Sequence, residues 1–168
     1  GLRFLKHLTR TRLLLHVVDV APFDESDPVE SAQSIAHELG QFSPTLAERP
    51  RWLVLNKLDL LPEDERESVA DAIIERLDWQ GPVFRVSAIS GDGTDALVQA
   101  VHRWLTEQRQ LENEDTEAAE HERAMQRRME DEAVARAESR LGRKRKRADD
   151  DDDDFDDDEY DIEVEYAP

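Results

Sequence analysis

The stretch LLLHVVDV at residues 13–20 decides the fold class. It is an almost continuous apolar run rich in valine, and a strand that is covered on both faces of a sheet has this pattern. The segment RWLVL at residues 51–55 repeats the pattern, and the shorter run VFRV occupies residues 83–86. We therefore expect three buried strands.

Helix signals separate the predicted strands. A polar residue followed by proline at residues 26–28 is typical of a helix start, and this helix is expected to reach residue 40. Pro62 and the acids after it predict a second helix that ends near Leu77, and a third helix follows residue 93. This alternation implies right-handed crossovers and an α/β fold in which helices flank a three-stranded parallel sheet. Residues 1–10 are also expected to form the end of a helix.

Charge and composition exclude several classes of protein. The chain has 22 basic and 41 acidic side chains among 168 residues and no cysteine, which excludes disulfide scaffolds, zinc-thiolate sites and cysteine nucleophiles and indicates a reducing, cytoplasmic setting. No apolar run approaches the length of about 20 residues that a membrane span needs. Such an acidic chain is not expected to bind a nucleic acid over a broad surface, so any contact with RNA must be local.

The composition divides the chain into three segments. Residues 1–111 form the folded block, and residues 112–142 form a charged extension with a thin apolar stripe, for which we expect a frayed, exposed helix that Gly142 ends. Residues 143–168 contain a basic block, RKRKR, and an acidic run that is expected to be disordered. The basic block is interpreted equally well as a solvated linker and as an RNA-binding patch.

Two polar clusters directly follow predicted strands. Asn56-Lys57-Leu58-Asp59 comes after the second strand and residues 87–93 come after the third. Because ligands bind at the carboxyl ends of parallel strands, the fold predicts one site that combines both clusters. The alternative for the first cluster is an ordinary strand-end turn, since Asn and Asp are common there.

The first cluster is suited to a guanine base. The carboxylate of Asp59 offers two acceptor oxygens, and guanine presents two adjacent donors, the ring N1–H and the exocyclic amine. Adenine presents neither, so the same carboxylate discriminates strongly. The stem of Lys57 can lie flat over the ring, and Asn56 can bond the base or tie down a neighbouring loop. The backbone N–H of Ala88 is expected to receive the guanine carbonyl.

These residues resemble known motifs. NKLD at residues 56–59 resembles the guanine-specificity motif of translation-factor-like GTPases, and SAIS at residues 87–90 resembles their second base-binding loop. GLRFLKHL at 1–8, HVVD at 16–19 and LAERPRWLVLNK at 46–57 are similar to the Obg family of ribosome-associated GTPases. The resemblance covers residues 1–105, and the acidic tail fits some bacterial members.

The resemblance implies a protein that binds GTP and GDP, hydrolyses GTP slowly with Mg²⁺, and acts in large ribosomal subunit biogenesis and in growth and stress control through contacts with ribosomal RNA and proteins. The guanine-contacting residues that it implies are Asn56, Lys57, Asp59, Ser87, Ala88 and Ile89.

The family's phosphate-binding loop, G-x-x-x-x-G-K-S/T, is absent, because no glycine of the chain precedes a lysine. We therefore expect the chain to be the C-terminal half of a P-loop GTPase domain. The Mg²⁺ ligands are then expected in a missing N-terminal half, and one edge of the first strand is left open where the missing strand pairs. This chain has no expected catalytic or metal-binding residue and is predicted to hydrolyse no GTP by itself, and the full-length protein is predicted to be a monomer. The alternative is an interaction module that acts without nucleotide through its charged extension.

Five further residues are candidates for structural roles. Asp19 is expected to order the loop after the first strand, and Thr94 or Asp95 to cap the following helix. Trp79 and Trp104 are expected in the core.

Overall fold

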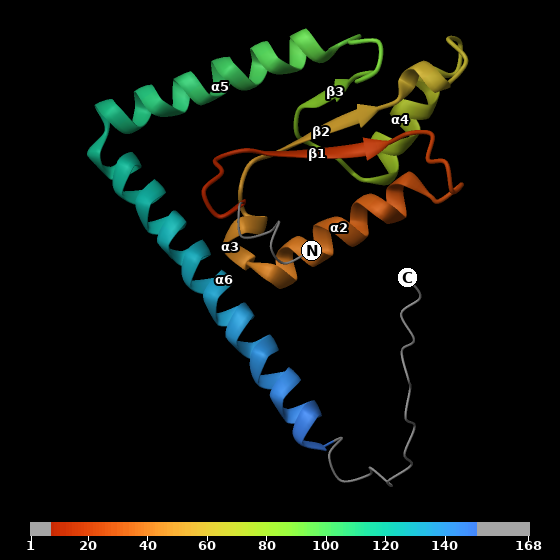
Figure 1. The fold of residues 1–168 in the computed structure, drawn as a ribbon. Helices are drawn as coiled ribbons and strands as arrows, with labels where there is room; N and C mark the ends of the chain where they lie inside the picture. Colours follow the sequence, from red (N-terminus) through yellow and green to blue (C-terminus); the bar gives the residue numbers. More distant parts are fainter. Residues whose placement is uncertain (1–7, 151–168) are drawn as a thin grey trace, which may run out of the picture. The chain divides into compact units, whose positions relative to one another are not determined.

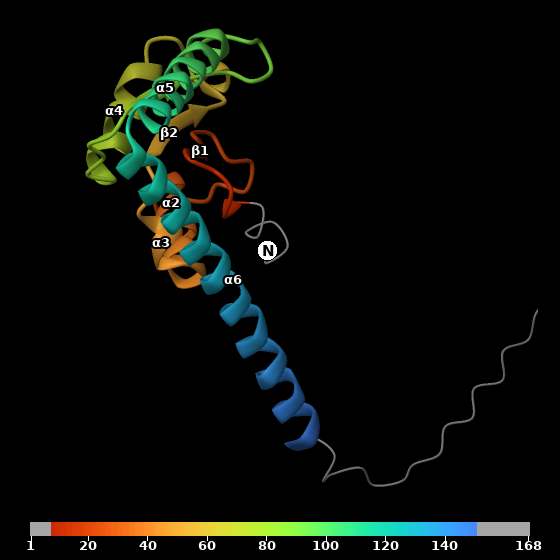
Figure 2. The same cartoon turned by 90° about the vertical axis from the view of Figure 1, so that its left-hand side faces the viewer.

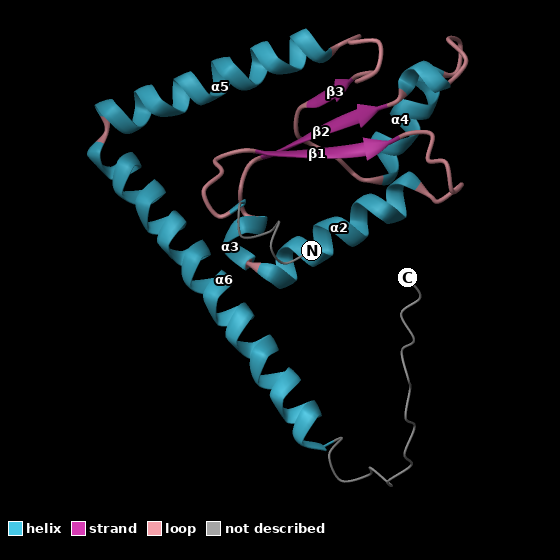
Figure 3. Cartoon of the chain, viewed as in Figure 1, coloured by secondary structure: helices cyan, strands magenta, loops and turns pink. Residues whose placement is uncertain are grey.

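The structure is a computed structural model that describes the backbone of residues 8–150 and the side chains of residues 8–139. It confirms an α/β fold with a three-stranded parallel sheet and flanking helices (Figures 1 and 3). Residues 1–7 of the helix expected at the start of the chain lie outside the described residues, while Leu8 is helical and residues 9–10 form a turn. The acidic run beyond residue 150 also lies outside the described residues. The elements are β1 (Leu14–Asp19), α2 (Pro28–Phe42), α3 (Pro44–Ala47), β2 (Arg51–Asn56), η1 (Leu58–Leu60), α4 (Arg66–Arg76), β3 (Val83–Arg85), α5 (Thr94–Glu114) and α6 (Thr116–Asp150).

The sheet has the order β1-β2-β3, and both neighbouring pairs are parallel. β2 is the central strand, and its four apolar residues at positions 52–55 are all buried. This explains why its sequence is apolar without alternation. The register places Asp19 beside Asn56, so β1 and β2 end together at one edge of the sheet.

Helices α2 and α4 cover one face of the sheet (Figure 1). The carboxylate of Asp27 caps α2 by accepting the N–H of Val29 at 2.8 Å, and Pro28 occupies the first turn as the sequence predicts. Ser43 then caps the short helix α3, which lies between the first predicted helix and the second predicted strand. The buried core on this face consists of Val18, Val20, Val29, Ala32, Leu53, Leu55, Leu58, Ala70 and Ile73.

The predicted start of α4 at Pro62 is wrong, because the helix begins at Arg66. The acidic residues after Pro62 form a turn in which the N–H of Glu65 donates to the Pro62 carbonyl at 3.0 Å. No side chain caps the helix, and its first buried residue is Ala70. The acidic residues after Pro62 therefore belong to a turn that precedes the helix and not to its first turn.

Helix α5 lies over the opposite face of the sheet (Figure 1). Trp104 meets Trp52 edge to face with ring centroids 6.2 Å apart, and Trp52 stacks on Phe84 at 5.3 Å. The expectation that Trp79 and Trp104 are core residues is met only in part, since both are half-buried. On the same face, Leu15 and Val17 of β1 are 41% and 54% exposed.

The prediction of a frayed, exposed extension is wrong for the first half of α6. Met129 is fully buried and Ala133 is 4% exposed, and they pack with Leu14, Phe42 and Leu46. Figures 1 and 2 show this part of α6 passing beside α3. Gly142 does not end the helix, which continues to Asp150. The thin apolar stripe of α6 is enough to bury these residues because it packs against a surface that is already apolar.

Polar contacts reinforce this packing. Glu132 accepts hydrogen bonds from the hydroxyls of Ser43 and Thr45 at 2.5 and 2.6 Å, and from the N–H of Thr45 at 3.2 Å. Glu122 accepts hydrogen bonds from both terminal nitrogens of Arg49 at 2.6 and 2.8 Å, and Arg49 is 5% exposed. Burial favours the neutral carboxyl, but these hydrogen bonds outweigh it and hold the pKa of both glutamates below the usual range.

By its internal contacts the chain divides into two compact units, residues 1–134 and residues 135–168. The first unit therefore extends beyond residue 111, where the composition changes. In the second unit, the described residues 135–150 are helical. Within the described part of the chain, no helix combines the length and the apolar character needed to cross a membrane.

Candidate functional site

Polar side chains gather at the carboxyl edge of the sheet. Asp19 ends β1, Asn56 ends β2, and Ser87 follows β3 by two residues. The loops after β2 and β3 are in contact, since the N–H of Leu58 donates to the Val86 carbonyl at 3.4 Å. The two polar clusters of the sequence therefore share one edge, as the parallel topology predicts.

Asn56 ties the two loops together. Its Oδ1 accepts the backbone N–H of Ala88 at 3.0 Å, across 32 residues of sequence. The sequence leaves two roles open for Asn56, a hydrogen bond to the base or one to a neighbouring loop, and the structure contains the hydrogen bond to the loop. The Ala88 N–H is thereby directed at Asn56, so the predicted hydrogen bond from this N–H to a guanine carbonyl requires the N–H to be shared.

Ser87 organises the second loop from inside. It is 2% exposed, its N–H donates to the Asp92 carbonyl at 2.9 Å, and its Oγ accepts the N–H of Ser90 at 3.2 Å. Ile89, in contrast, is 91% exposed. Ser87 therefore shapes the loop, while Ile89 presents an apolar side chain to the surroundings.

Gly93 ends this loop in a conformation that other residues rarely adopt. Its φ is +72°, and a Cβ there would lie 2.2 Å from the Arg85 carbonyl oxygen. Gly93 is also the N-cap of α5, so the prediction of a cap at Thr94 or Asp95 is wrong. The Thr94 hydroxyl instead donates to the Gly91 carbonyl at 2.6 Å.

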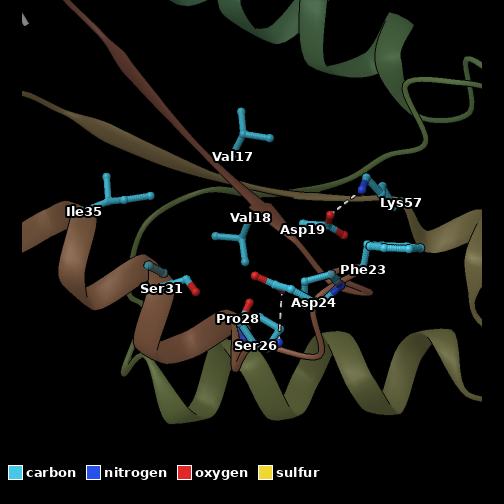
Figure 4. Close-up of a pocket in the computed structure, with 12 residues that line it drawn as sticks. Val17, Val18, Asp19, Phe23, Asp24, Ser26, Pro28, Ser31, Ile35 and Lys57 are labelled. Atoms are coloured by element: carbon cyan, nitrogen blue, oxygen red, sulfur yellow. Dashed lines mark hydrogen bonds and ion pairs between the residues drawn. The ribbon is translucent and has the colours of Figure 1, made fainter. Parts of the chain in front are cut away.

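Lys57 turns the chain after β2. Its φ of 70° is left-handed, and its carbonyl accepts the N–H of Leu60 at 3.1 Å. Its Nζ lies 2.5 Å from Oδ2 of Asp19 (Figure 4). The other carboxylate oxygen of Asp19 accepts the N–H of Ala21 at 3.0 Å, which confirms the predicted loop-ordering role.

Asp59 follows in the 3₁₀ turn η1 and is half-buried. Among the side chains that the structure describes, none forms a hydrogen bond or an ion pair with its carboxylate. Both of its oxygens are therefore able to accept hydrogen bonds from a ligand.

A cavity of about 510 Å³ lies on the β1 side of Lys57 (Figure 4). Its wall is mainly apolar, with Val17, Phe23 and Ile35, and Asp19 and Lys57 border it. Neither Asp59 nor the loop after β3 lines this cavity. Hydrogen bonds from Ser26 lower the pKa of Asp24, another of its lining residues. Of the six residues expected to contact guanine, the cavity includes only Lys57.

The pairing of Asp19 with Lys57 is the feature of this site that the sequence interpretation missed. The parallel register provides the signal for it: Asp19 lies opposite Asn56, so the next residue along the chain is within reach. In the described part of the chain, no group of three or more His, Cys, Asp or Glu side chains is arranged to hold a metal ion. No protein-family model matches the chain.

Proposed function

We propose that this chain is the guanine-recognising part of a GTPase that resembles the Obg family. The observation that carries the proposal is the hydrogen bond between Asn56 Oδ1 and the Ala88 N–H, which joins the two loops whose sequences resemble base-binding motifs. It places the NKLD turn and the SAIS loop at one edge of a parallel sheet, where such folds bind ligands.

The chemistry of the turn supports a guanine base. The Asp59 carboxylate has no partner among the described side chains, so it can accept the N1–H and the amine of guanine together. Adenine would present a lone pair to the same carboxylate and leave it desolvated without compensation. Paired recognition of this kind discriminates by several powers of ten when the site is closed to water.

In the complete GTPase that we propose, GTP and GDP are the ligands, and the phosphates and Mg²⁺ are bound by segments with a phosphate-binding loop, which this sequence lacks. Large ribosomal subunit biogenesis and growth or stress control are the processes that the family resemblance suggests. Ribosomal RNA and proteins are then the partners.

Titration of the chain with nucleoside monophosphates tests base recognition directly. Guanosine monophosphate carries the base with less negative phosphate charge than GTP, which matters for a chain of net charge −19. We expect it to shift the amide resonances of residues 56–59 and 87–89 with a dissociation constant of roughly millimolar order. Adenosine monophosphate is expected to leave these resonances unchanged, and inosine monophosphate, which lacks the amine, to bind more weakly than guanosine monophosphate.

The variant Asp59→Asn provides the specificity test. The amide supplies a donor that the xanthine carbonyl needs, so the preference should change from guanosine to xanthosine monophosphate. Asp64→Asn, which removes an exposed carboxylate from the following turn, is the matched control and should retain the guanine preference. Equal responses to guanosine and adenosine monophosphates, or an unchanged preference in Asp59→Asn, contradict the proposed function.

A further inference from the structure

The ion pair between Asp19 and Lys57 joins the ends of two neighbouring strands. Lys57 Nζ lies 2.5 Å from Asp19 Oδ2, so the lysine stem extends from the end of β2 to the end of β1 (Figure 4). Loop ordering by Asp19 uses only its other oxygen, which accepts the N–H of Ala21. The contact with Lys57 therefore needs a separate explanation.

The backbone holds both partners in place. Asp19 lies in register with Asn56, and the next N–H, that of Val20, donates to the Asn56 carbonyl at 3.0 Å. Lys57 has a left-handed backbone conformation, and the 3₁₀ turn that follows it holds that conformation, because the N–H of Leu60 donates to the Lys57 carbonyl at 3.1 Å. The two side chains thus start from defined positions on adjacent strands.

Stability is a poor explanation for this pair. The side chains of Lys57 and Asp19 are 44% and 32% exposed, and ion pairs with that exposure contribute little to folding. Lysine has one of the most flexible side chains, however, so an oriented carboxylate at the end of β1 biases the direction in which its stem lies. The main effect of the pair is on the direction of the lysine stem.

The pair also affects Asp59, two residues further along. A free ammonium group at residue 57 would be attracted to this carboxylate and would compete with a ligand for its oxygens. With the ammonium bound to Asp19, the Asp59 carboxylate has no partner among the described side chains. The methylene stem is then available as an apolar surface for the face of a planar ring.

We propose that Asp19 is a positioning residue for guanine recognition: it binds the Lys57 ammonium, which orients the lysine stem against the base and keeps the ammonium away from Asp59. This inference rests on the proposed function. Asp19 itself touches no ligand in this scheme and acts only through Lys57.

A double-mutant cycle on the 168-residue chain tests the role, with guanosine monophosphate as the probe. Asp19→Asn should weaken binding about two- to fivefold, as expected for one partly exposed charge contact. The same substitution should have no further effect in a Lys57→Met background, because the group through which Asp19 acts is then absent. Asp19→Glu should restore part of the affinity. The control is Asp24→Asn, because the Asp24 carboxylate accepts the N–H of Ser26. This variant should bind guanosine monophosphate as the wild type does.

The acylation rate of Lys57 by an amine-reactive ester gives a second readout that needs no nucleotide. The chain has four lysines, so the rates at Lys6, Lys144 and Lys146 serve as internal references. Asp19→Asn should raise the Lys57 rate roughly twofold or more relative to these references, because the ammonium loses its partner. Asp24→Asn should leave the rate unchanged.

The outcomes separate the two proposals. If the wild-type chain does not respond to guanosine monophosphate, the proposed function fails, and the acylation rates still decide whether Asp19 holds Lys57. If the wild type binds but Asp19→Asn binds equally well, the positioning role is overturned alone. An equal loss of affinity in the Lys57→Met background also overturns it, because Asp19 then acts through the fold.

Discussion

The hydroxyl of Thr45 donates a 2.6 Å hydrogen bond to Glu132 across 87 residues of sequence. Thr45 is 1% exposed, and the same carboxylate accepts the hydroxyl of Ser43, which is fully buried. This contact attaches α6 to the corner between α2 and α3. The charged extension is therefore part of the first compact unit as far as Val134.

Glu132→Ala should destabilise the chain by about 1–3 kcal/mol, because it leaves two buried hydroxyl groups and one N–H without their acceptor. Urea unfolding followed by tryptophan fluorescence measures the change. Glu120→Ala removes an exposed carboxylate from the same helix and should change the free energy of unfolding by less than about 0.5 kcal/mol. Equal effects of the two substitutions would contradict the attachment of α6.

The contribution of this attachment should depend on pH. The pKa of Glu122 and that of Glu132 are lowered in the folded protein from an ordinary value of 4.5, so each carboxylate stabilises the fold above that value. The stabilisation is lost as the pH falls through the lower folded pKa. The difference in free energy of unfolding between the wild type and Glu132→Gln should therefore shrink between about pH 5 and about pH 3. A constant difference over that range would show that the charge of Glu132 is not what matters.

Gly93→Ala should destabilise the fold by about 1–3 kcal/mol, since its φ is +72° and the added Cβ would approach the Arg85 carbonyl to 2.2 Å. The matched control is Gly40→Ala in α2, where the nearest atom to an added Cβ is 3.9 Å away. That substitution should stabilise the helix by up to about 1 kcal/mol. Thermal unfolding of both variants provides the comparison, and a neutral Gly93→Ala would exclude the strained loop geometry.

Asn56→Ala should release the loop after β3 without unfolding the sheet. The Ala88 N–H loses its acceptor, so its hydrogen exchange should accelerate by at least about tenfold relative to the wild type. The amide of Val86, which donates to the Leu55 carbonyl at 2.8 Å, serves as the internal reference and should remain protected. If the exchange of the Ala88 amide does not change, Asn56 does not tie the loops together.

Much of the fold could be predicted from local patterns. Apolar runs without alternation identified three strands, and Pro28 after Asp27 identified the start of α2, because each of these signals is a direct backbone or burial requirement. The acids after Pro62 did not begin a helix, since exposed carboxylates near a helix start contribute little compared with burial of Ala70 and Ile73. Thr94 failed as a predicted cap because the tight approach to Arg85 requires glycine at the preceding position.

For the candidate site, the sequence predicts which residues lie at the carboxyl edge of the sheet. Parallel topology brings Asn56 near the loop at Ala88, but the choice of hydrogen-bond partner depends on atomic distances that spacing does not determine. The pairing of Lys57 with Asp19 depends likewise on the register between β1 and β2. The burial of Met129 was missed because the sequence shows the thin apolar stripe but not the distant apolar corner against which it packs.

The attachment of α6 has a consequence for how this sequence evolves. A helix that only linked two regions would accept almost any polar substitution along its length. Here selection should act on one narrow line of positions, those of Glu122, Met129, Glu132 and Ala133, together with their partners Arg49, Ser43 and Thr45. Between those positions the sequence should drift freely, so related chains are expected to retain this spaced pattern while they lose overall similarity.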